Sequence, residues 1–345
     1  MDRVDALTDV TGLRVGHARL PGDGALTGTT VVLAPEGGAV AAVDVRGGGP
    51  GTKETDALDP LNLVSRVDAV VLTGGSAYGL DAVSGVMAWL EERGRGVRVG
   101  PDPSQVVPVV PAAALFDLGR GGDWRARPDA AVGRAAVEAA AASEPGSPVA
   151  QGSVGAGTGA VAGGLRGGVG TASVRLDSGV TVGALVVVNA AGSVVDPLTG
   201  VLYGRMLEGR TAYPADPVHE AALERLAAAK AATSERAAGY VRPPLNTTLA
   251  VVGTDAALTK AQARKLAGTS HDGLARAVRP VHLMNDGDTV FALSAGEREV
   301  PGVEEFNAVL AAGADAVTRA VVRAVLHAEG VDGPGGVFPS YRDLY

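Results

Sequence analysis

Short runs of β-branched and apolar residues, which alternate with longer helical segments, constrain the fold of this chain most. Seven runs are typical of strands: 29–34, 39–45, 68–75, 171–176, 181–190, 248–254 and 289–295. Four segments have helical periodicity: 80–94, 217–237, 258–277 and 304–330. The Asp-Ser-Gly at 177–179 stands between two of the strand runs and predicts a hairpin. At least part of the sheet is therefore expected to be antiparallel.

Hairpins combined with long amphipathic helices favour two sheets packed face to face with helices outside them, rather than one parallel sheet. We expect residues 1–345 to form a single α/β domain, with no internal repeat and one linker at 236–244. Gly accounts for 50 residues, about twice the average usage, and the glycines follow no collagen period. We interpret them as sites of close backbone packing and tight turns.

Composition excludes several classes of function. The absence of Cys excludes disulfides, thiolate catalysis and cysteine metal sites, and the five His lack metal-ligand spacing, so we expect no metal and no cofactor. A net charge of −8 without a Lys/Arg cluster argues against a nucleic-acid partner. The first ten residues lack a signal-peptide pattern, and no uncharged apolar stretch reaches the ~20 residues of a membrane span. We expect a cytoplasmic protein without membrane contact.

Three glycine-rich motifs are weaker than they look. GGSAYGL (74–80) resembles a nucleophile elbow around Ser76, but Tyr78 replaces the last Gly of G-x-S-x-G, and no His or acid is nominated as a partner. A strand-to-helix turn that lines a substrate is favoured. GGGPGTKET (47–55) is not a P-loop because Thr52 separates Gly from Lys. GSVGAGTGAVAGG (152–164) contains a dinucleotide-binding variant, but the segment after it is too rich in Gly for a helix, which favours a close approach to another backbone.

Two polar motifs stand beside strand runs. PPLNTTLAVVGTDA (243–256) places Asn246 and Thr247 before an apolar run, either as a loop-to-strand junction or as a peptide bond built to be cleaved. NDGDTVF (285–291) places Asp286 and Asp288 two residues apart, so on a strand both carboxylates face one side. The alternative is an Asp-Gly turn with solvated acids. The formal glycosylation sequon at 246–248 carries no weight without a secretory signal.

Together these segments resemble a known family, the self-cleaving DmpA-like aminopeptidases of the L-aminopeptidase/D-esterase type, and are most similar to its nylon-oligomer hydrolase branch. Six blocks carry the resemblance: 43–56, 72–82, 152–160 with 166–173, 186–192, 246–260 and 284–293. The resemblance implies an α/β/β/α sandwich similar to that of N-terminal nucleophile hydrolases. It further implies cleavage between Asn246 and Thr247 into chains 1–246 and 247–345. It assigns Thr247 as nucleophile, Asp286 and Asp288 as the acidic pair and Asn189 as oxyanion donor.

The chemistry of these side chains fits that assignment. The Thr247 hydroxyl can attack the preceding carbonyl and form an ester, which water then hydrolyses. The freed α-amino group has a reference pKa of about 7.7–8.0 and can serve as general base near neutral pH. The implied substrates are small amides or peptides, nylon oligomers of the 6-aminohexanoate type among them. The resemblance also implies a homo-oligomer, a tetramer of cleaved pairs.

Two positions depart from the family pattern and keep other functions open. Arg166 stands where the family often has Lys, so it can supply only a fixed charge, to the substrate carbonyl or to the acidic pair. Phe116 stands where a Tyr lies near the oxyanion hole, which removes a hydroxyl donor. The alternatives are therefore a weakly active or non-catalytic small-molecule binding or assembly protein on the same fold, and a Ser76 hydrolase whose chain stays uncut.

Overall fold

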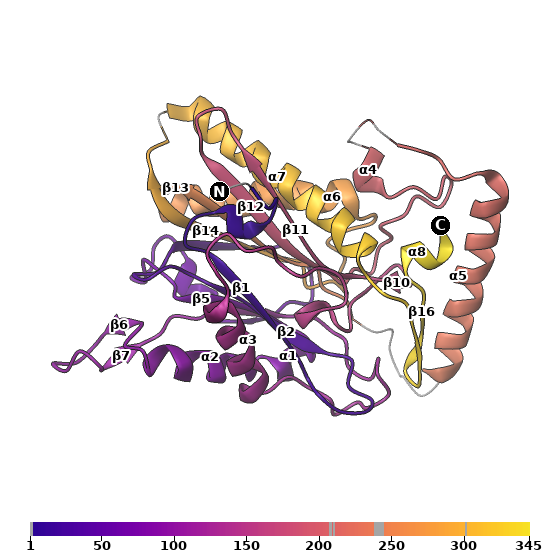
Figure 1. The fold of residues 1–345 in the computed structure, drawn as a ribbon, viewed down its shortest axis with the longest axis horizontal. Coiled ribbons are helices and arrows are strands. Elements are labelled where there is room, and N and C mark those ends of the chain that lie inside the picture. Colours follow the sequence, from indigo (N-terminus) through magenta and orange to yellow (C-terminus); the bar gives the residue numbers. More distant parts are fainter. Residues whose placement is uncertain (1–2, 207–208, 210, 238–244, 301) are drawn as a thin grey trace.

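The computed structural model describes residues 3–206, 209, 211–237, 245–300 and 302–345. Two five-stranded sheets form its centre (Figure 1). The first has the strand order β1-β2-β5-β8-β4, with bounds β1 Arg14–Arg19, β2 Gly28–Leu33, β5 Ala69–Thr73, β8 Ala112–Ala114 and β4 Gly51–Lys53. The second has the order β11-β12-β13-β14-β3, with bounds β11 Gly168–Arg175, β12 Thr181–Val188, β13 Leu249–Ala256, β14 Thr289–Arg298 and β3 Val40–Val45.

Shorter strands and the helices complete the described part of the chain. The short strands pair as β6 Val97–Arg98 with β7 Val106–Val107, β9 Val161–Ala162 with β10 Leu165–Arg166, and β15 Val331–Gly333 with β16 Gly336–Phe338. The α-helices are α1 Ser76–Gly79, α2 Ala82–Glu91, α3 Ala130–Ala142, α4 Tyr203–Met206, α5 Asp216–Arg236, α6 Lys260–Ala277, α7 Gly302–Leu326 and α8 Tyr341–Leu344. The 3-10 helices are η1 Leu7–Asp9, η2 Asp56–Leu58 and η3 Gly155–Gly157.

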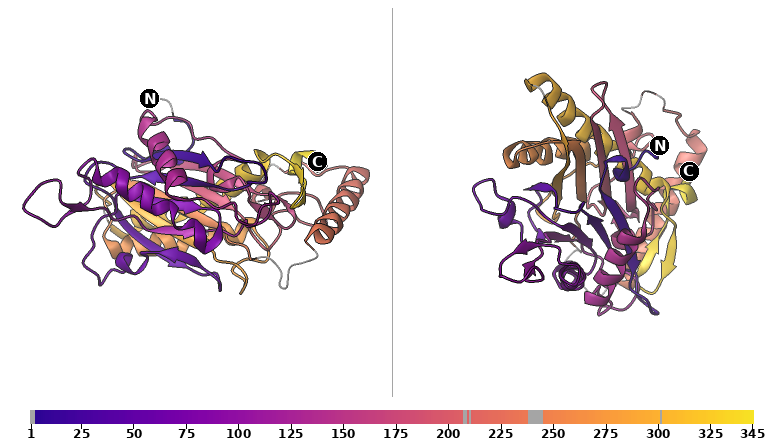
Figure 2. Two further views of the ribbon diagram at one scale, coloured as in Figure 1. Left: turned by 90° about the horizontal axis from the view of Figure 1, so that it is seen from below. Right: turned by 60° about the vertical axis from the view of Figure 1, so that its left-hand side comes forward.

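The sheets pack face to face, and each carries two helices on its outer side (Figures 1 and 2). Apolar side chains of both sheets meet in the middle, among them Val32 and Leu72 from the first and Leu185, Val251 and Phe291 from the second. Helices α2 and α3 cover the first sheet, and α6 and α7 cover the second. The predicted α/β/β/α sandwich is therefore confirmed.

Strand pairing follows the sequence signals closely. The hairpin predicted at 177–179 joins β11 and β12, which pair antiparallel from Arg175 and Thr181 onward. Strands β13 and β14, in contrast, run parallel, with Leu249 opposite Thr289. The same register continues in front of the strands, where Asn246 pairs with Asp286. Because the chain enters both strands from one end of the sheet, the two polar motifs come to lie side by side.

Glycines allow backbones to approach closely, as their number predicts. A Cβ on Gly170 of β11 would lie 2.0 Å from the Ala320 carbonyl oxygen of α7, so no side chain fits between strand and helix. A Cβ on Gly157, inside the 152–164 motif, would lie 2.5 Å from the Val169 nitrogen. The motif thus lies directly against β11, as the interpretation of a close backbone approach predicted.

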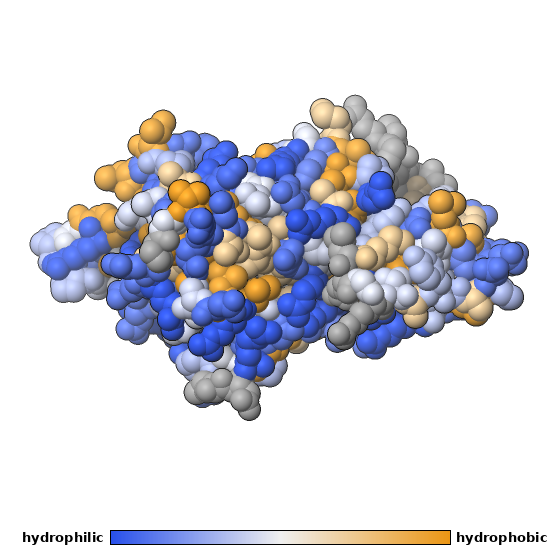
Figure 3. Space-filling view, turned by 90° about the horizontal axis from the view of Figure 1, so that it is seen from above, coloured by the Kyte–Doolittle hydropathy of each residue, from blue (hydrophilic) through white to orange (hydrophobic). Residues whose placement is uncertain are grey.

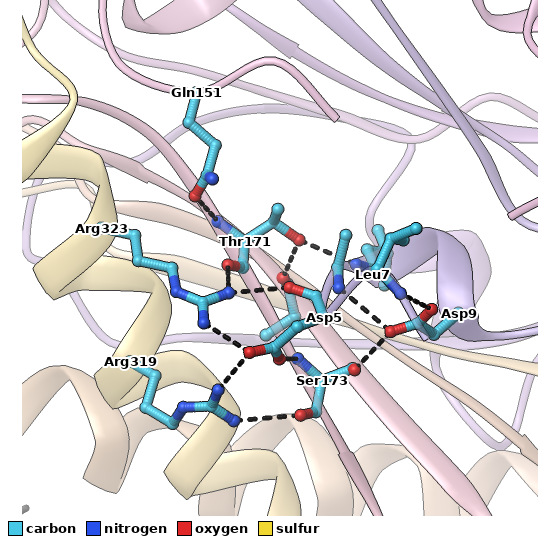
Figure 4. A network of polar contacts seen from close by, with 11 residues as sticks. Asp5, Leu7, Asp9, Gln151, Thr171, Ser173, Arg319 and Arg323 are labelled. Atoms are coloured by element: carbon cyan, nitrogen blue, oxygen red, sulfur yellow. Dashed lines mark hydrogen bonds and ion pairs between the residues drawn. The ribbon is translucent and has the colours of Figure 1, made fainter. Parts of the chain in front are cut away.

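The amino-terminal segment is tied to the second sheet by a polar network (Figure 4). The Asp5 carboxylate accepts hydrogen bonds from the guanidinium groups of Arg319 and Arg323 on α7, and from the Ser173 N–H at 2.9 Å. Asp9 accepts the Ser173 hydroxyl at 2.6 Å. These contacts hold η1 against β11 and β12, and Leu7 enters the core between the sheets.

Two parts project from the sandwich at opposite ends (Figures 1 and 2). The hairpin β6–β7 extends from one end, and α5 stands at the other, against β16 and α8. Within the linker predicted at 236–244, residues 238–244 lie outside the described residues. No helix in the described part of the chain is long and apolar enough to span a membrane. The face shown in Figure 3 is mostly polar, with apolar side chains in small groups.

Candidate active site

The peptide group between Asn246 and Thr247 is held from two sides just before β13. The Gly287 N–H donates to the Asn246 carbonyl oxygen at 3.0 Å, and the Thr247 N–H donates to the Asn189 carbonyl oxygen at 2.6 Å. The Thr247 hydroxyl donates to the same Asn246 oxygen at 2.5 Å. Thr247 is only 3% exposed. The Thr247 hydroxyl therefore lies next to the Asn246 carbonyl group, which it would attack in a self-cleavage reaction. The Gly287 N–H already donates to the carbonyl oxygen on which negative charge would then develop.

The two acids lie on either side of this peptide group. Asp286 accepts the Ala191 N–H at 3.0 Å and the Leu283 N–H at 3.2 Å. Burial, and then the charge of Asp288, raise the pKa of Asp286. Asp288 accepts the Thr248 N–H through Oδ1 at 2.7 Å. Asp288 thus holds the backbone immediately after the proposed nucleophile, while Asp286 ties the segment after β12 to the loop before β14.

The interpretation of these acids as solvated residues of a turn is wrong. Both side chains are 1% exposed, and every hydrogen bond described above comes from the protein backbone. Burying two neighbouring carboxylates costs free energy, and the same acids in a solvated turn would not have this cost. Buried carboxyl groups with a perturbed pKa, such as Asp286, are common at functional sites.

The glycine motif at 47–55 closes over the acidic loop. The Gly47 N–H donates to the Asp288 carbonyl oxygen at 3.3 Å, and the Gly49 N–H donates to the Asp286 carbonyl oxygen at 2.8 Å. A Cβ on Gly47 would lie 2.3 Å from the Asp288 nitrogen, so only Gly fits there. The motif that resembled a phosphate loop therefore serves as a clamp on the acids.

Asn189 and Phe116 both reach the site, on its other side. Asn189 is fully buried after β12, and its side-chain amide donates to the Phe116 carbonyl oxygen at 3.2 Å. Its Oδ1 accepts the Val161 N–H at 3.0 Å and the Arg120 guanidinium. In this uncut chain the hydrogen bond to the Asn246 carbonyl oxygen comes from Gly287, and the oxyanion role of Asn189 stays a prediction.

Arg120 is a site residue that the sequence did not single out. It is buried, and it donates to the side chains of Asn189 and Asn246, to the latter at 3.3 Å. It also donates to the Gly159 carbonyl oxygen at 2.7 Å. A lone Arg in a Gly-rich stretch carries no sequence signal, because its importance comes entirely from contacts distant along the chain.

Arg166 lies fully buried but away from the acids. Its guanidinium donates to the Glu329 and Thr158 carbonyl oxygens, at 3.0 and 2.6 Å, and to the Ser153 hydroxyl at 3.1 Å. Burial lowers its pKa to about 10, so the group stays charged at neutral pH. None of its hydrogen bonds among the described residues goes to the acidic pair, so an anchoring role for Arg166 would have to act at a distance.

Ser76 lies at the strand-to-helix turn predicted for it, as the first residue of α1 after β5. Its φ of 52° is unusual for a residue other than Gly, and its N–H donates to the Leu115 carbonyl oxygen at 2.8 Å. In the described part of the chain, no histidine or carboxylate forms a hydrogen bond with the Ser76 hydroxyl. The geometry thus supplies no base for Ser76.

A mostly apolar cavity of about 310 Å³ opens beside Asn246. Its lining includes Phe116, Leu118, Val161, Ala190, Lys230 and Phe338. Arg120 and Lys230 are the charged residues among the described lining, which contains no carboxylate. Asn246, on the carbonyl side of the bond that the sequence predicts to be cleaved, is one of the residues that line this cavity. Over the described residues, no group of three or more His, Asp or Glu side chains could hold a metal ion.

Comparisons with known proteins agree with this geometry. The model of peptidase family S58 matches residues 5–338. A protein of Mycobacterium tuberculosis called an uncharacterized aminopeptidase is 50% identical over 99% of this chain and 98% of its own length. The 6-aminohexanoate-oligomer endohydrolase of a Kocuria species is 31% identical over 85% of this chain and 76% of its own length.

Two solved structures share the fold. The L-aminopeptidase D-Ala-esterase/amidase of Ochrobactrum anthropi, described as a new variant of the Ntn hydrolase fold, has a TM-score of 0.72 at 22% identity. The match covers 99% of this chain and 93% of that one. A β-aminopeptidase of a Burkholderia species has a TM-score of 0.71 at 24% identity, covering 98% and 91% of the two chains. The predicted resemblance to N-terminal nucleophile hydrolases is confirmed at the level of the fold.

Proposed function

Since this chain belongs to peptidase family S58 and is a hydrolase acting on amide or peptide bonds, we propose that it cleaves itself and then works as an N-terminal threonine amidohydrolase. The cut lies between Asn246 and Thr247, which gives chains 1–246 and 247–345. The observation that carries the proposal is the hydrogen bond from the Thr247 hydroxyl to the carbonyl oxygen of the preceding residue.

Self-cleavage proceeds by an acyl shift and a hydrolysis. The Thr247 Oγ1 attacks the Asn246 carbonyl carbon, and the Gly287 N–H stabilises the resulting oxyanion. The C–N bond breaks, the hydroxyl proton passes to the departing nitrogen, and an ester joins the two residues. Water hydrolyses this ester to the Asn246 carboxylate and the Thr247 hydroxyl. The product is a free α-amino group on Thr247.

The mature site uses the same atoms on an external amide. The freed α-amino group accepts the Thr247 hydroxyl proton as Oγ1 attacks the substrate, and passes it to the leaving amine. The Asn189 carbonyl oxygen, which already accepts the Thr247 N–H, keeps the amine oriented. Asp286 and Asp288 hold the local positive charge, and Asn189 supplies an amide N–H to the oxyanion. Water then releases the acyl group from Thr247.

The substrates proposed are small amides and peptides with a compact acyl part. The cavity of about 310 Å³ accepts a short aliphatic acyl group against its apolar wall. The names of the relatives point to aminopeptidase and to 6-aminohexanoate-oligomer hydrolysis, and both substrate types fit this description. We also expect a cytoplasmic tetramer of cleaved pairs, for which light scattering is the test.

Denaturing mass spectrometry tests the proposal. The purified protein should show two fragments, the smaller of 99 residues beginning at Thr247 and about 10 kDa by proportion of length. Thr247→Ser keeps a hydroxyl and should still be cut, whereas Thr247→Ala should stay intact and inactive. A wild-type chain that remains at 34.3 kDa after long incubation at neutral pH contradicts the proposal. A cut chain without amidase activity favours the non-catalytic binding protein.

A further inference from the structure

The carboxylate of Asp288 accepts hydrogen bonds both from the start of the strand that follows Thr247 and from His282. Its Oδ1 accepts the Thr248 N–H at 2.7 Å. Its Oδ2 accepts both hydrogen-bond donors of His282, the backbone N–H at 3.1 Å and the ring Nδ1 at 2.8 Å. Each oxygen therefore has a donor, and His282 and Thr248 together orient the carboxylate.

His282 is itself held in an uncommon conformation. Its φ is 60°, in the left-handed region that His and Asn tolerate better than most residues other than Gly. This conformation is what lets one residue present its backbone N–H and its ring Nδ1 to a single oxygen. Because the buried Asp288 Oδ2 is the acceptor, Nδ1 of His282 carries the hydrogen. The ring is therefore the Nδ1–H tautomer or the cation.

A second histidine supports the ring from the far side. The His271 ring lies 4.8 Å from that of His282, centre to centre, at an interplanar angle of 77°. His271 is fully buried, and its Nε2 donates to the Asp44 carbonyl oxygen at 3.0 Å. Burial lowers the pKa of His271 to about 4, so this ring is neutral at neutral pH. It therefore packs edge-on against the His282 ring as a neutral neighbour.

We propose that His282 is a positioning residue of the hydrolase, which aims Asp288 at the amino end of the cleaved strand. The inference rests on the proposed function. Before the cut, a fixed Asp288 holds the Thr248 N–H and so keeps the Thr247 hydroxyl on its target. After the cut, the same carboxylate lies beside the start of the new chain, and together with the Asn189 carbonyl oxygen it orients the new α-amino group.

Two substitutions of His282 test the hydrogen bond of its ring separately from that of its backbone N–H, and a third substitution elsewhere serves as the control. His282→Gly removes the ring but accepts the positive φ, so it should fold. We expect kcat and the rate of self-cleavage to fall roughly 10- to 100-fold, the range for losing a hydrogen bond to a charged group, with KM nearly unchanged. His282→Asn keeps a donor near Nδ1 and also tolerates the conformation, and it should recover most of the loss. His327→Ala, at an exposed ring at the end of α7, is the matched control and should behave as wild type.

The outcomes separate this inference from the function on which it rests. If wild type cuts itself and hydrolyses an amide while His282→Gly does so equally fast, only the role of His282 is refuted. Equal losses in the Gly and Asn variants would also refute it. Histidine-selective ¹⁵N NMR on the uncut Thr247→Ala chain tests it without activity. A hydrogen on Nδ1 of His282 supports the inference, and a neutral ring protonated on Nε2 overturns it.

Discussion

Replacing Gly287 by Ala tests whether the Thr247 hydroxyl acts from the position that the structure gives it. A Cβ at this residue would lie 2.6 Å from Thr247 Oγ1, where ordinary contact begins at 3.4 Å, so the hydroxyl or the loop must move by about 0.8 Å. Gly287 does not have a positive φ, so Ala causes no φ strain there, and the N–H that supports the Asn246 oxygen is retained. The Cβ would also lie 2.9 Å from the Gly49 carbonyl oxygen, so part of the shift falls on the loop. Since a displacement near 1 Å can cost about 100-fold, we expect self-cleavage to slow roughly 10- to 100-fold.

The assay follows the intact chain by mass spectrometry after synthesis in a cell-free system, which gives a rate for wild type and variants alike. Gly49→Ala is the matched control, because Gly49 lies on the clamp over the same loop but a Cβ there has its nearest neighbour at 3.5 Å. Its rate should stay within about threefold of wild type. Melting curves of Thr247→Ala chains with and without each change show whether folding is affected. Wild-type cleavage in Gly287→Ala, or equal slowing in Gly49→Ala, would refute the reasoning.

Two further predictions concern charge. Burial raises the pKa of Asp117 to about 6 from 3.8, so the folded state binds the proton more tightly, and the free energy of unfolding should fall by about 3 kcal/mol as pH rises from 4 to above 6. Denaturant titrations of uncut Thr247→Ala chains measure the free energy of unfolding at each pH. Adding Asp117→Asn, which keeps an acceptor for the Gly75 N–H, should make the loss of stability between pH 4 and 6 smaller. The same pH dependence with and without Asp117→Asn would contradict this prediction. The exposed Lys230 side chain lies along Gly164 at the cavity. We compare two anilide substrates, one with a glutaric acyl group, which is anionic, and one with a 4-aminobutyric acyl group, which is cationic. Lys230→Glu should shift the ratio of their kcat/KM values by about fivefold in favour of the cationic substrate. An unchanged ratio would place Lys230 outside the acyl subsite.

Much of the fold could be predicted because its signals are local. The Asp-Ser-Gly turn lies between two apolar runs, and the observed hairpin needs nothing from elsewhere in the chain. Helix α6 begins where the sequence indicates, since Thr259 and Gln262 cap each other's backbone N–H groups. The parallel pairing of β13 with β14 was not predicted. The sequence of the connecting helix α6 does not indicate which position in the sheet the next strand takes.

The site was predictable where chemistry needs a side chain and obscure where it uses the backbone. Thr247 and the two acids stand out because hydroxyls and carboxylates beside apolar runs are unusual. Gly287 contributes an N–H that every residue except Pro has, so no letter of the sequence marks it. Arg166 shows the limit of the charge signal. Its charge indicated a role at the substrate carbonyl or at the acidic pair, whereas its contacts with the Glu329 and Thr158 carbonyl oxygens depend on packing that no sequence pattern shows.

The arrangement around Thr247 explains why a chain poor in aromatics and rich in Gly suits this chemistry. Self-cleavage requires a hydroxyl held on its own preceding carbonyl, so backbone from several segments must converge on one peptide group. Gly47 lies on Asp288 and Gly287 lies on Thr247 at distances that no side chain would permit. A larger residue at either point would push the segments apart and leave the hydroxyl solvated. The same closeness buries both carboxylates, and burial raises the pKa of Asp286. The glycines thus stabilise the geometry from which the proposed self-cleavage would start.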